Sequence, residues 1–145
     1  MRLYTIGFTK KSAERFFTLL KEARVQRVLD IRLNNRSQLA GFSKATDLEY
    51  FLREIAGIEY RHVPELAPTQ ELLDSYKKQK GSWSQYEERF LGLLRSRAVE
   101  HSFDRSVFDM GCLLCSEHQP EHCHRRLVAE YLNEKWGDIE IQHLV

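Results

Sequence analysis

The hydrophobic residues of the chain alternate between two patterns, short β-rich runs and longer segments with helical spacing. Five runs have the apolar and β-branched composition of strands, and they cover residues 3–8, 25–32, 58–63, 107–115 and 139–145. From Ser12 onward, apolar residues recur every three or four positions, which places them on one face of a helix. The run 107–115 is apolar at most positions, which is typical of a central strand covered on both faces.

Helix start and stop signals place the remaining helices. A hydroxyl followed three residues later by Glu, the spacing of a capping box, occurs at Thr46 and again at Ser84. The segment 69–106 contains no good strand and predicts one or two helices. Pro120 suits the first turn of a last helix, which Gly137 ends.

Strands that alternate with helices in this way are typical of parallel βαβ units. The pattern predicts a Rossmann-like α/β fold, a small doubly wound and mostly parallel five-stranded sheet with helices on both faces. A length of 145 residues fits one single domain over residues 1–145. In such sheets, ligands bind beyond the carboxyl ends of the strands. The residues expected there are Gly7, Thr9, Asp30, Arg32, Glu65, Cys115 and Glu117.

Composition and charge narrow the class of partner. Hydrophobic residues make up 42% of the chain and charged residues 30%, as in an ordinary globular protein. The net charge of +1 gives no general attraction to nucleic acid or to an anionic membrane, so an anion site must be local. The sequence has no signal-peptide core and no apolar run of about 18 residues, which predicts a cytoplasmic protein without a membrane partner.

The segment 115–126 holds most of the groups that could carry out chemistry. If the last helix begins at about Pro120, then Cys123, His124 and Arg125 lie in its first turn. Unpaired N–H groups and the helix dipole favour a thiolate or a bound anion at that position, and Arg125 can grip phosphate or carboxylate through two hydrogen bonds. A surface helix start with a small buried cysteine is the alternative.

Zinc is the competing interpretation of this cluster. Cys112, Cys115, Cys123 and His124 supply three sulfurs and an imidazole, while three cysteines so close together exclude a disulfide scaffold. In an extended strand, however, the odd spacing places Cys112 and Cys115 on opposite faces of the sheet, and a turn would be needed to bring both to one metal. We therefore expect no metal and no cofactor.

Several short motifs occur along the chain, each of them once. They are Thr5-Ile6-Gly7, Asp30-Ile31-Arg32 with Ser37, the segment 57–66, and the run Cys-x-Glu-x-x-Pro-x-x-Cys-His-Arg over residues 115–125. Together they resemble the family called domain of unknown function 488, and the resemblance spans nearly the whole chain. It implies a prokaryotic α/β protein whose signature residues gather at one site, and it implies no reaction. Residues 34–37 and 67–68 depart from the family's pattern, so the rim of the site is expected to differ.

The first functional hypothesis is a small enzyme, a hydrolase or transferase, that acts on an anionic substrate bearing phosphate or a nucleotide. Cys115 or Cys123 is the candidate nucleophile or, as the alternative, an inert residue that shapes the site; Glu117 or Asp30 is the candidate acid or base. The candidate substrate-binding residues are Arg32, Ser37, Glu65, His124 and Arg125. An ion pair of Asp30 and Arg32 with each other, or with Glu117, at the strand end is an equally supported interpretation.

A non-catalytic module that binds a nucleotide or nucleic acid is the second hypothesis. It would use the same arginines with Arg36, Lys44 and Arg61 around them, and Trp83 and Tyr86 could stack on bases, although aromatic residues at helical spacing are more often core. The near-zero net charge makes nucleic acid the less favoured partner. A purely structural interaction protein, the third hypothesis, would leave the cysteine segment without a role.

Overall fold

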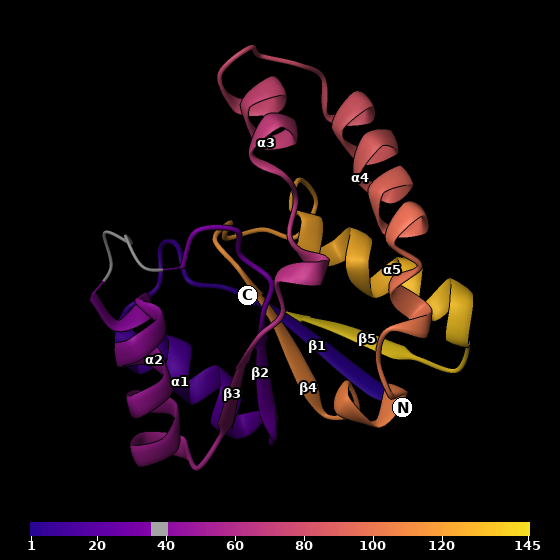
Figure 1. The fold of residues 1–145 in the computed structure, drawn as a ribbon. Helices are drawn as coiled ribbons and strands as arrows, with labels where there is room; N and C mark the ends of the chain where they lie inside the picture. Colours follow the sequence, from indigo (N-terminus) through magenta and orange to yellow (C-terminus); the bar gives the residue numbers. More distant parts are fainter. Residues whose placement is uncertain (36–40) are drawn as a thin grey trace.

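The computed structural model describes residues 1–35 and 41–145, and its centre is a parallel β-sheet (Figure 1). The strands are β1 (Arg2–Gly7), β2 (Arg27–Asp30), β3 (Glu59–His62), β4 (Gly111–Cys115) and β5 (Glu140–Leu144). Their order in the sheet is β3-β2-β4-β1-β5, and each neighbouring pair is parallel. Strand β4 lies in the middle and is buried at every residue, which agrees with its apolar composition. The predicted parallel α/β sheet is confirmed.

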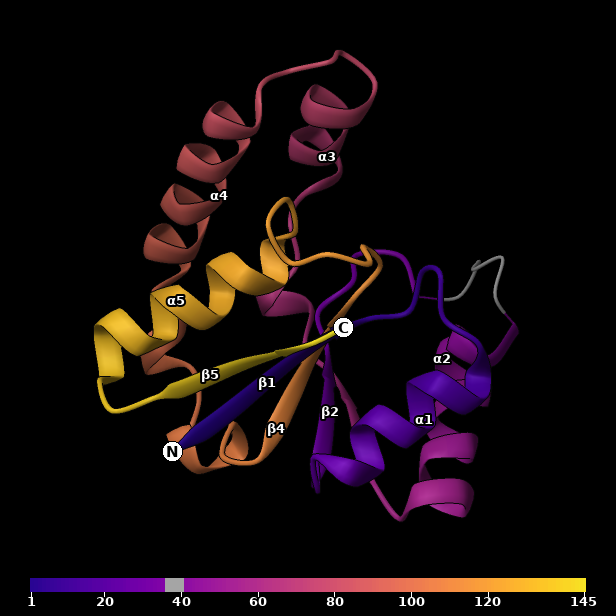
Figure 2. The ribbon, with the colours of Figure 1, turned by 180° about the vertical axis from the view of Figure 1, so that it is seen from behind.

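Helices cover both faces of the sheet (Figures 1 and 2). On one face lie α1 (Ala13–Glu22) and α2 (Ala45–Phe51), which continues into a π-helical turn (Leu52–Ala56); on the other lie α3 (Gln70–Lys77), α4 (Trp83–Arg97) and α5 (His124–Trp136). Single 3₁₀ turns span Gly41–Ser43, Pro64–Leu66, Val99–His101 and Arg105–Val107. Among the helices of the described residues, none has both the length and the apolar character needed to cross a membrane.

Alternation along the strands divides the core into two layers. Leu3, Leu29 and Leu113 face one layer, which contains the buried residues of α4 and α5. Tyr4, Val28 and Cys112 face the other, which contains those of α1 and α2. This period of two is the geometry of a pleated strand, and it determines which side chains of β4 can reach the site.

Helix caps follow the sequence signals only in part. Ser12, where the helical spacing begins, caps α1 by accepting a hydrogen bond from the Arg15 N–H. For α4 the cap is Ser82, two residues before the predicted Ser84, because Ser82 has the extended backbone that a cap requires. The prediction of a cap at Thr46 is wrong, since α2 has already begun at Ala45.

Two elements that approach the site begin later than the sequence predicts. The strand expected over 107–115 begins at Gly111, because Arg105–Val107 forms a 3₁₀ turn and Met110 has a left-handed backbone with φ of 57°. The last helix begins at His124 and not at Pro120. The Cys123 N–H donates to the Pro120 carbonyl at 3.2 Å, which closes a turn before the helix.

Candidate functional site

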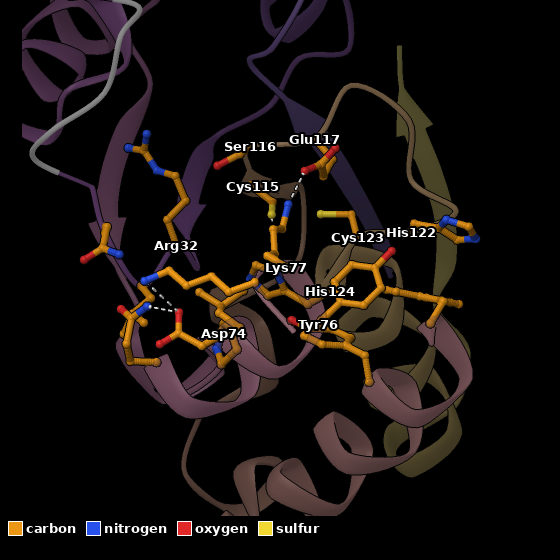
Figure 3. A pocket seen from close by; sticks show the side chains of 18 residues that line it. Arg32, Asp74, Tyr76, Lys77, Cys115, Ser116, Glu117, His122, Cys123 and His124 are labelled. Atoms are coloured by element: carbon orange, nitrogen blue, oxygen red, sulfur yellow. Dashed lines mark hydrogen bonds and ion pairs between the residues drawn. The ribbon is translucent and has the colours of Figure 1, made fainter. Parts of the chain in front are cut away.

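A pocket of about 360 Å³ lies beyond the carboxyl ends of β2 and β4, between the start of α5 and the hairpin of α3 and α4 (Figure 3). Cys115, Cys123 and His124 form one end of it. The residues lining the other walls include Arg32, Asp74, Tyr76, Lys77, Lys78, Trp83, Tyr86, Glu117 and His122. The position of the pocket agrees with the rule that ligands bind at this edge of a parallel sheet.

The cysteines and the histidine form a tight cluster. Cys115 Sγ lies 3.3 Å from His124 Nδ1, and the potential ligand atoms of Cys115, Cys123 and His124 all lie within 4.8 Å of one another. His124 Nε2 lies 2.8 Å from the carbonyl oxygen of Ile31. A carbonyl can only accept, so Nε2 carries a proton and donates it, and Nδ1 is the ring nitrogen that faces the sulfur.

The cluster follows from local chain geometry. Cys115 ends β4, Cys123 is the extended residue that precedes α5, and His124 is the first residue of that helix. Cys112 lies in the opposite core layer, as the odd spacing predicts, and burial raises the pKa of its thiol. All three cysteines are free and buried.

Ionisation within the cluster is unequal. Burial raises the pKa of the Cys115 thiol, and its hydrogen bond with Cys123 raises it further. Burial also opposes ionisation of Cys123, but hydrogen bonds from Cys115 and His124 and the positive charge of Arg125 outweigh it, so the pKa of Cys123 lies below its usual value. A thiolate in this cluster is therefore centred on Cys123.

Asp30 and Arg32 form a buried, bidentate ion pair with each other. Arg32 Nε and Nη2 both donate to the carboxylate at 2.8 Å, and both side chains are almost completely buried. The Tyr60 hydroxyl donates to the same carboxylate at 2.5 Å, and burial together with Asp30 raises the pKa of Tyr60. These contacts correspond to the ion pair that the sequence left open. They place Asp30 behind the wall of the pocket.

Arg32 retains one unused donor. Its Nη1 atom is buried and finds no hydrogen-bond acceptor in the part of the chain that the structure describes. The guanidinium lies over the ring of Phe8, 5.4 Å from its centre, and the side chain lines the pocket. Arg32 therefore combines a structural ion pair with a positive charge at the pocket wall.

Arg125 has a structural set of partners in place of the anion that the sequence predicted. Its guanidinium is fully buried and donates to Thr5 Oγ1 and to the backbone carbonyls of Glu117 and His118 at 3.2, 2.5 and 3.1 Å. Because α5 begins later than expected, the side chain reaches back to the loop after β4. Gly7 allows this loop to approach, since a Cβ there would lie 1.6 Å from the Glu117 carbonyl oxygen. Arg125 and Gly7 thus hold the loop over the sheet edge.

Glu117 lies at the rim of the pocket, where it pairs with Lys77 of α3 (Figure 3). The Lys77 Nζ to Glu117 Oε1 distance is 2.8 Å, and both side chains are about half exposed. Partial burial lowers the pKa of Lys77, but the hydrogen bond and charge of Glu117 outweigh this and leave it raised. The pair joins the hairpin to the loop that follows β4.

The pocket brings together five of the nine candidate residues. They are Arg32, Cys115, Glu117, Cys123 and His124. Glu65 is exposed in a 3₁₀ turn and is not among the described residues that line the pocket, because the chain turns away directly after β3. Ser37 lies outside the described residues.

The walls from the helical hairpin contain residues that sequence reasoning did not place. Trp83 stacks on Tyr86 and on His122, with ring centres 5.0 Å apart in each case. The sequence marks Trp83 and Tyr86 only as aromatic candidates for stacking on bases. Lys77 carried no signal of its own, since it lies in a polar run of residues 77–80 that is typical of a solvated surface.

Two kinds of chemistry suit this arrangement. A thiolate beside an imidazole can act as a nucleophile with an adjacent acid or base. Two sulfurs and an imidazole nitrogen that converge on one point are also ligands for a soft divalent metal ion. Both uses place the reacting centre at the end of the pocket that Cys115, Cys123 and His124 form.

Comparison with known proteins identifies a family without assigning a reaction. The family model described as domain of unknown function DUF488 matches residues 12–132. No curated protein and no solved structure matches the chain. The match covers most of the sequence and includes the strands and helices that form the pocket. The chain therefore belongs to the DUF488 family.

Proposed function

We propose that this protein is an enzyme that acts on a small anionic substrate, bearing phosphate or a nucleotide, in the pocket beyond β2 and β4. The observation that carries the proposal is the convergence of Cys115, Cys123 and His124 at one end of a pocket of about 360 Å³. This volume lies within the range of about 300 to 1,000 Å³ that small-molecule sites occupy. The cluster supplies the reacting end, and the rest of the pocket binds the substrate.

Positive charge around the pocket supports an anionic substrate. Arg32, Lys77 and Lys78 line it, and the first residue of α5 lies at its end. The positive end of a helix dipole stabilises negative charge, and within the described chain the Cys123 side chain makes no capping hydrogen bond. Lys77 and Lys78 also pair with Glu117 and Asp74, at 2.8 and 3.6 Å, so an anionic substrate would share these lysines with the two carboxylates.

The size and aromatic wall of the pocket support a substrate larger than phosphate alone. Tyr76, Trp83 and Tyr86 pack on one another and line the same side. Such a wall can bury the apolar part of a ligand, while a few charged groups fix its orientation. A nucleoside monophosphate has both parts, an anionic group and a planar, largely apolar one.

The experiment measures binding of inorganic phosphate, AMP and UMP by calorimetry to the wild type and to Lys77→Met. We expect at least one of the nucleotides to bind, and Lys77→Met to weaken binding about 10-fold or more, since a hydrogen bond to a charged group contributes about 1.5–3 kcal/mol. Lys21→Met is the matched control, because Lys21 is exposed on α1, on the other face of the sheet. Bound nucleotide should also slow iodoacetamide labelling of Cys115 and Cys123.

Absence of binding by all three ligands at millimolar concentration, with labelling unchanged, would contradict the proposal. Equal loss of affinity in Lys77→Met and Lys21→Met would place the binding outside the pocket. Retention on heparin distinguishes a nucleic-acid-binding module from the proposed enzyme, because a module that binds a nucleic-acid backbone elutes late with a steep salt dependence. A small-anion enzyme with this net charge elutes early.

A further inference from the structure

The sulfurs of Cys115 and Cys123 point toward one another beside the ring of His124 (Figure 3). We infer that Cys115 Sγ, Cys123 Sγ and His124 Nδ1 are three ligands of a divalent metal ion of the zinc class. The inference deepens the proposed function and rests on it, because the ion would occupy the reacting end of the same pocket.

The distances fit a tetrahedral ion. Zn–S bonds of about 2.3 Å and Zn–N bonds of about 2.0 Å imply, at tetrahedral angles, a sulfur-to-nitrogen separation of about 3.5 Å and a sulfur-to-sulfur separation of about 3.8 Å. Cys115 Sγ and His124 Nδ1 are 3.3 Å apart, and the potential ligand atoms of the cluster lie within 4.8 Å of one another. Side-chain shifts of less than about 1 Å would therefore place an ion between them.

The ring of His124 is oriented as a metal ligand requires. Its Nε2–H donates to the Ile31 carbonyl at 2.8 Å, which leaves Nδ1 as the nitrogen whose lone pair can bind an ion. Metal-bound histidines nearly always donate their second N–H to a carbonyl, a carboxylate or water. Phe90 packs edge-on against the ring at 5.5 Å and restricts its rotation. The ligand atom thus faces the two sulfurs before an ion arrives.

Charge balance favours a divalent ion in this environment. Cys115, Cys123 and His124 are 5, 2 and 7% exposed. Two thiolates and a neutral imidazole together carry the charge that cancels one divalent cation, so the complete site is neutral. Placing two thiolates there without the cation would leave uncompensated buried charge, which is strongly unfavourable. The soft sulfur ligands favour zinc over magnesium or calcium.

The fourth position opens toward the pocket. Cys115, Cys123 and His124 all line the pocket, and in the described chain they are the single group of three potential ligands close enough to share an ion. Glu117 is held by Lys77, and His122 is stacked on Trp83. Three protein ligands with one open position are typical of catalytic zinc, whereas structural zinc has four. Water or an anionic oxygen of the substrate would take the open position.

The inferred site departs from the expectation of no metal. That expectation rested on Cys112, which lies on the opposite face of β4, as the odd spacing predicts. The ligands Cys115, Cys123 and His124 need no contribution from Cys112, and none of them requires the strand to turn.

The test uses cobalt as a spectroscopic substitute for zinc. The reduced, metal-free protein is titrated with Co²⁺, and we expect one equivalent to give thiolate-to-cobalt charge-transfer bands and the intense visible bands of tetrahedral cobalt. Zinc should displace the cobalt and remove both. Loss of a partner that only orients a ligand costs about 10 to 100-fold in affinity, so removal of a ligand in Cys115→Ser or Cys123→Ser should cost at least about 100-fold. Cys112→Ala is the matched control and should bind cobalt as the wild type does.

Weak octahedral bands without charge transfer, or equal cobalt affinity in Cys115→Ser and Cys112→Ala, would overturn the inference. If the serine variants do not fold, as judged by circular dichroism, the wild-type spectrum and stoichiometry decide the question. Nucleotide binding by a protein that gives no thiolate-to-cobalt bands would overturn the metal site and leave the proposed function intact. Thiolate-to-cobalt bands in a protein that binds no anion would overturn the proposed function and leave the metal site intact.

Discussion

Removing either partner of the buried Asp30–Arg32 ion pair should strongly destabilise the fold. The pair is bidentate, with both hydrogen bonds at 2.8 Å, and the two side chains are 0 and 2% exposed. In Asp30→Asn the Arg32 guanidinium stays buried but loses its counter-charge. In Arg32→Met the Asp30 carboxylate stays buried and loses its counter-charge in the same way. Each charge is then held out of water without an ionic partner.

The structure sets the expected magnitude. Breaking one side of a buried ion pair typically costs about 3–5 kcal/mol, a large fraction of a total stability of about 5–15 kcal/mol. Tyr60 and the Asn35 amide still contact the carboxylate in Arg32→Met, so this variant should be at the lower end. For a chain of this size, such losses correspond to a fall in melting temperature of about 10 °C.

Urea denaturation of both single variants and of the double variant measures the effect as a cycle. The double variant contains no uncompensated charge, so its loss should be smaller than the sum of the single losses by about 2 kcal/mol or more. Glu59→Gln is the matched control on the neighbouring strand. Its pair with Arg27 is partly exposed, so its loss should cost less than about 1 kcal/mol.

Two results would refute this reasoning. Single variants that lose less than about 1 kcal/mol would mean that water reaches the pair and screens it. A double variant whose loss equals the sum of the two singles would mean that the charges do not interact. In either case Asp30 would be free for another role.

Three further predictions concern residues around the site, two through substitutions and one through a labelling rate. Gly7→Ala should lower stability by about 1–3 kcal/mol, measured by urea denaturation, because the Cβ of the new alanine would collide with the Glu117 carbonyl. An unchanged midpoint of the urea transition would show that the loop after β4 moves freely. Arg125→Lys should cost about 2–4 kcal/mol of stability by the same assay, because a lysine ammonium cannot reach all three acceptors of the Arg125 guanidinium. Arg126→Lys, on the helix surface, is the control and should cost less than about 1 kcal/mol. Equal losses in the two variants would contradict the structural role of Arg125. Burial, with repulsion from Arg125, lowers the pKa of Lys11 to about 8. Acetylation near pH 8 should therefore modify Lys11 faster than the exposed Lys78, as measured by peptide mass spectrometry. A slower reaction at Lys11 would contradict this prediction.

The sequence predicted the sheet well because strand and helix periods differ clearly along this chain. All five strands fall within their predicted runs or one residue outside them. The main error, residues 107–110, arose because an apolar composition is shared by buried strands and by buried turns. The 3₁₀ turn at Arg105–Val107 and the left-handed backbone of Met110 distinguish the two, and both are visible only in the folded chain.

The candidate site residues that line the pocket lie mostly close together in sequence. Cys115, Glu117, Cys123 and His124 fall within ten residues of one another and line one pocket. Arg125 shows the limit of this reasoning, because a guanidinium can donate to backbone carbonyls as well as to phosphate. Which of the two it meets depends on where α5 begins, and the position of Pro120 gave that start four residues too early.

The two ends of the pocket are formed by different parts of the chain. The reacting end depends on the ends of β2 and β4 and the start of α5, whose positions are fixed by the sheet. The opposite wall comes from the α3–α4 hairpin, which is joined to that end through the Lys77–Glu117 pair and the stacking of Trp83 on His122. Under the proposed function, the kind of chemistry is therefore set by a short segment with a recognisable motif. The choice of substrate would be set by a hairpin whose contribution is visible only in the folded chain.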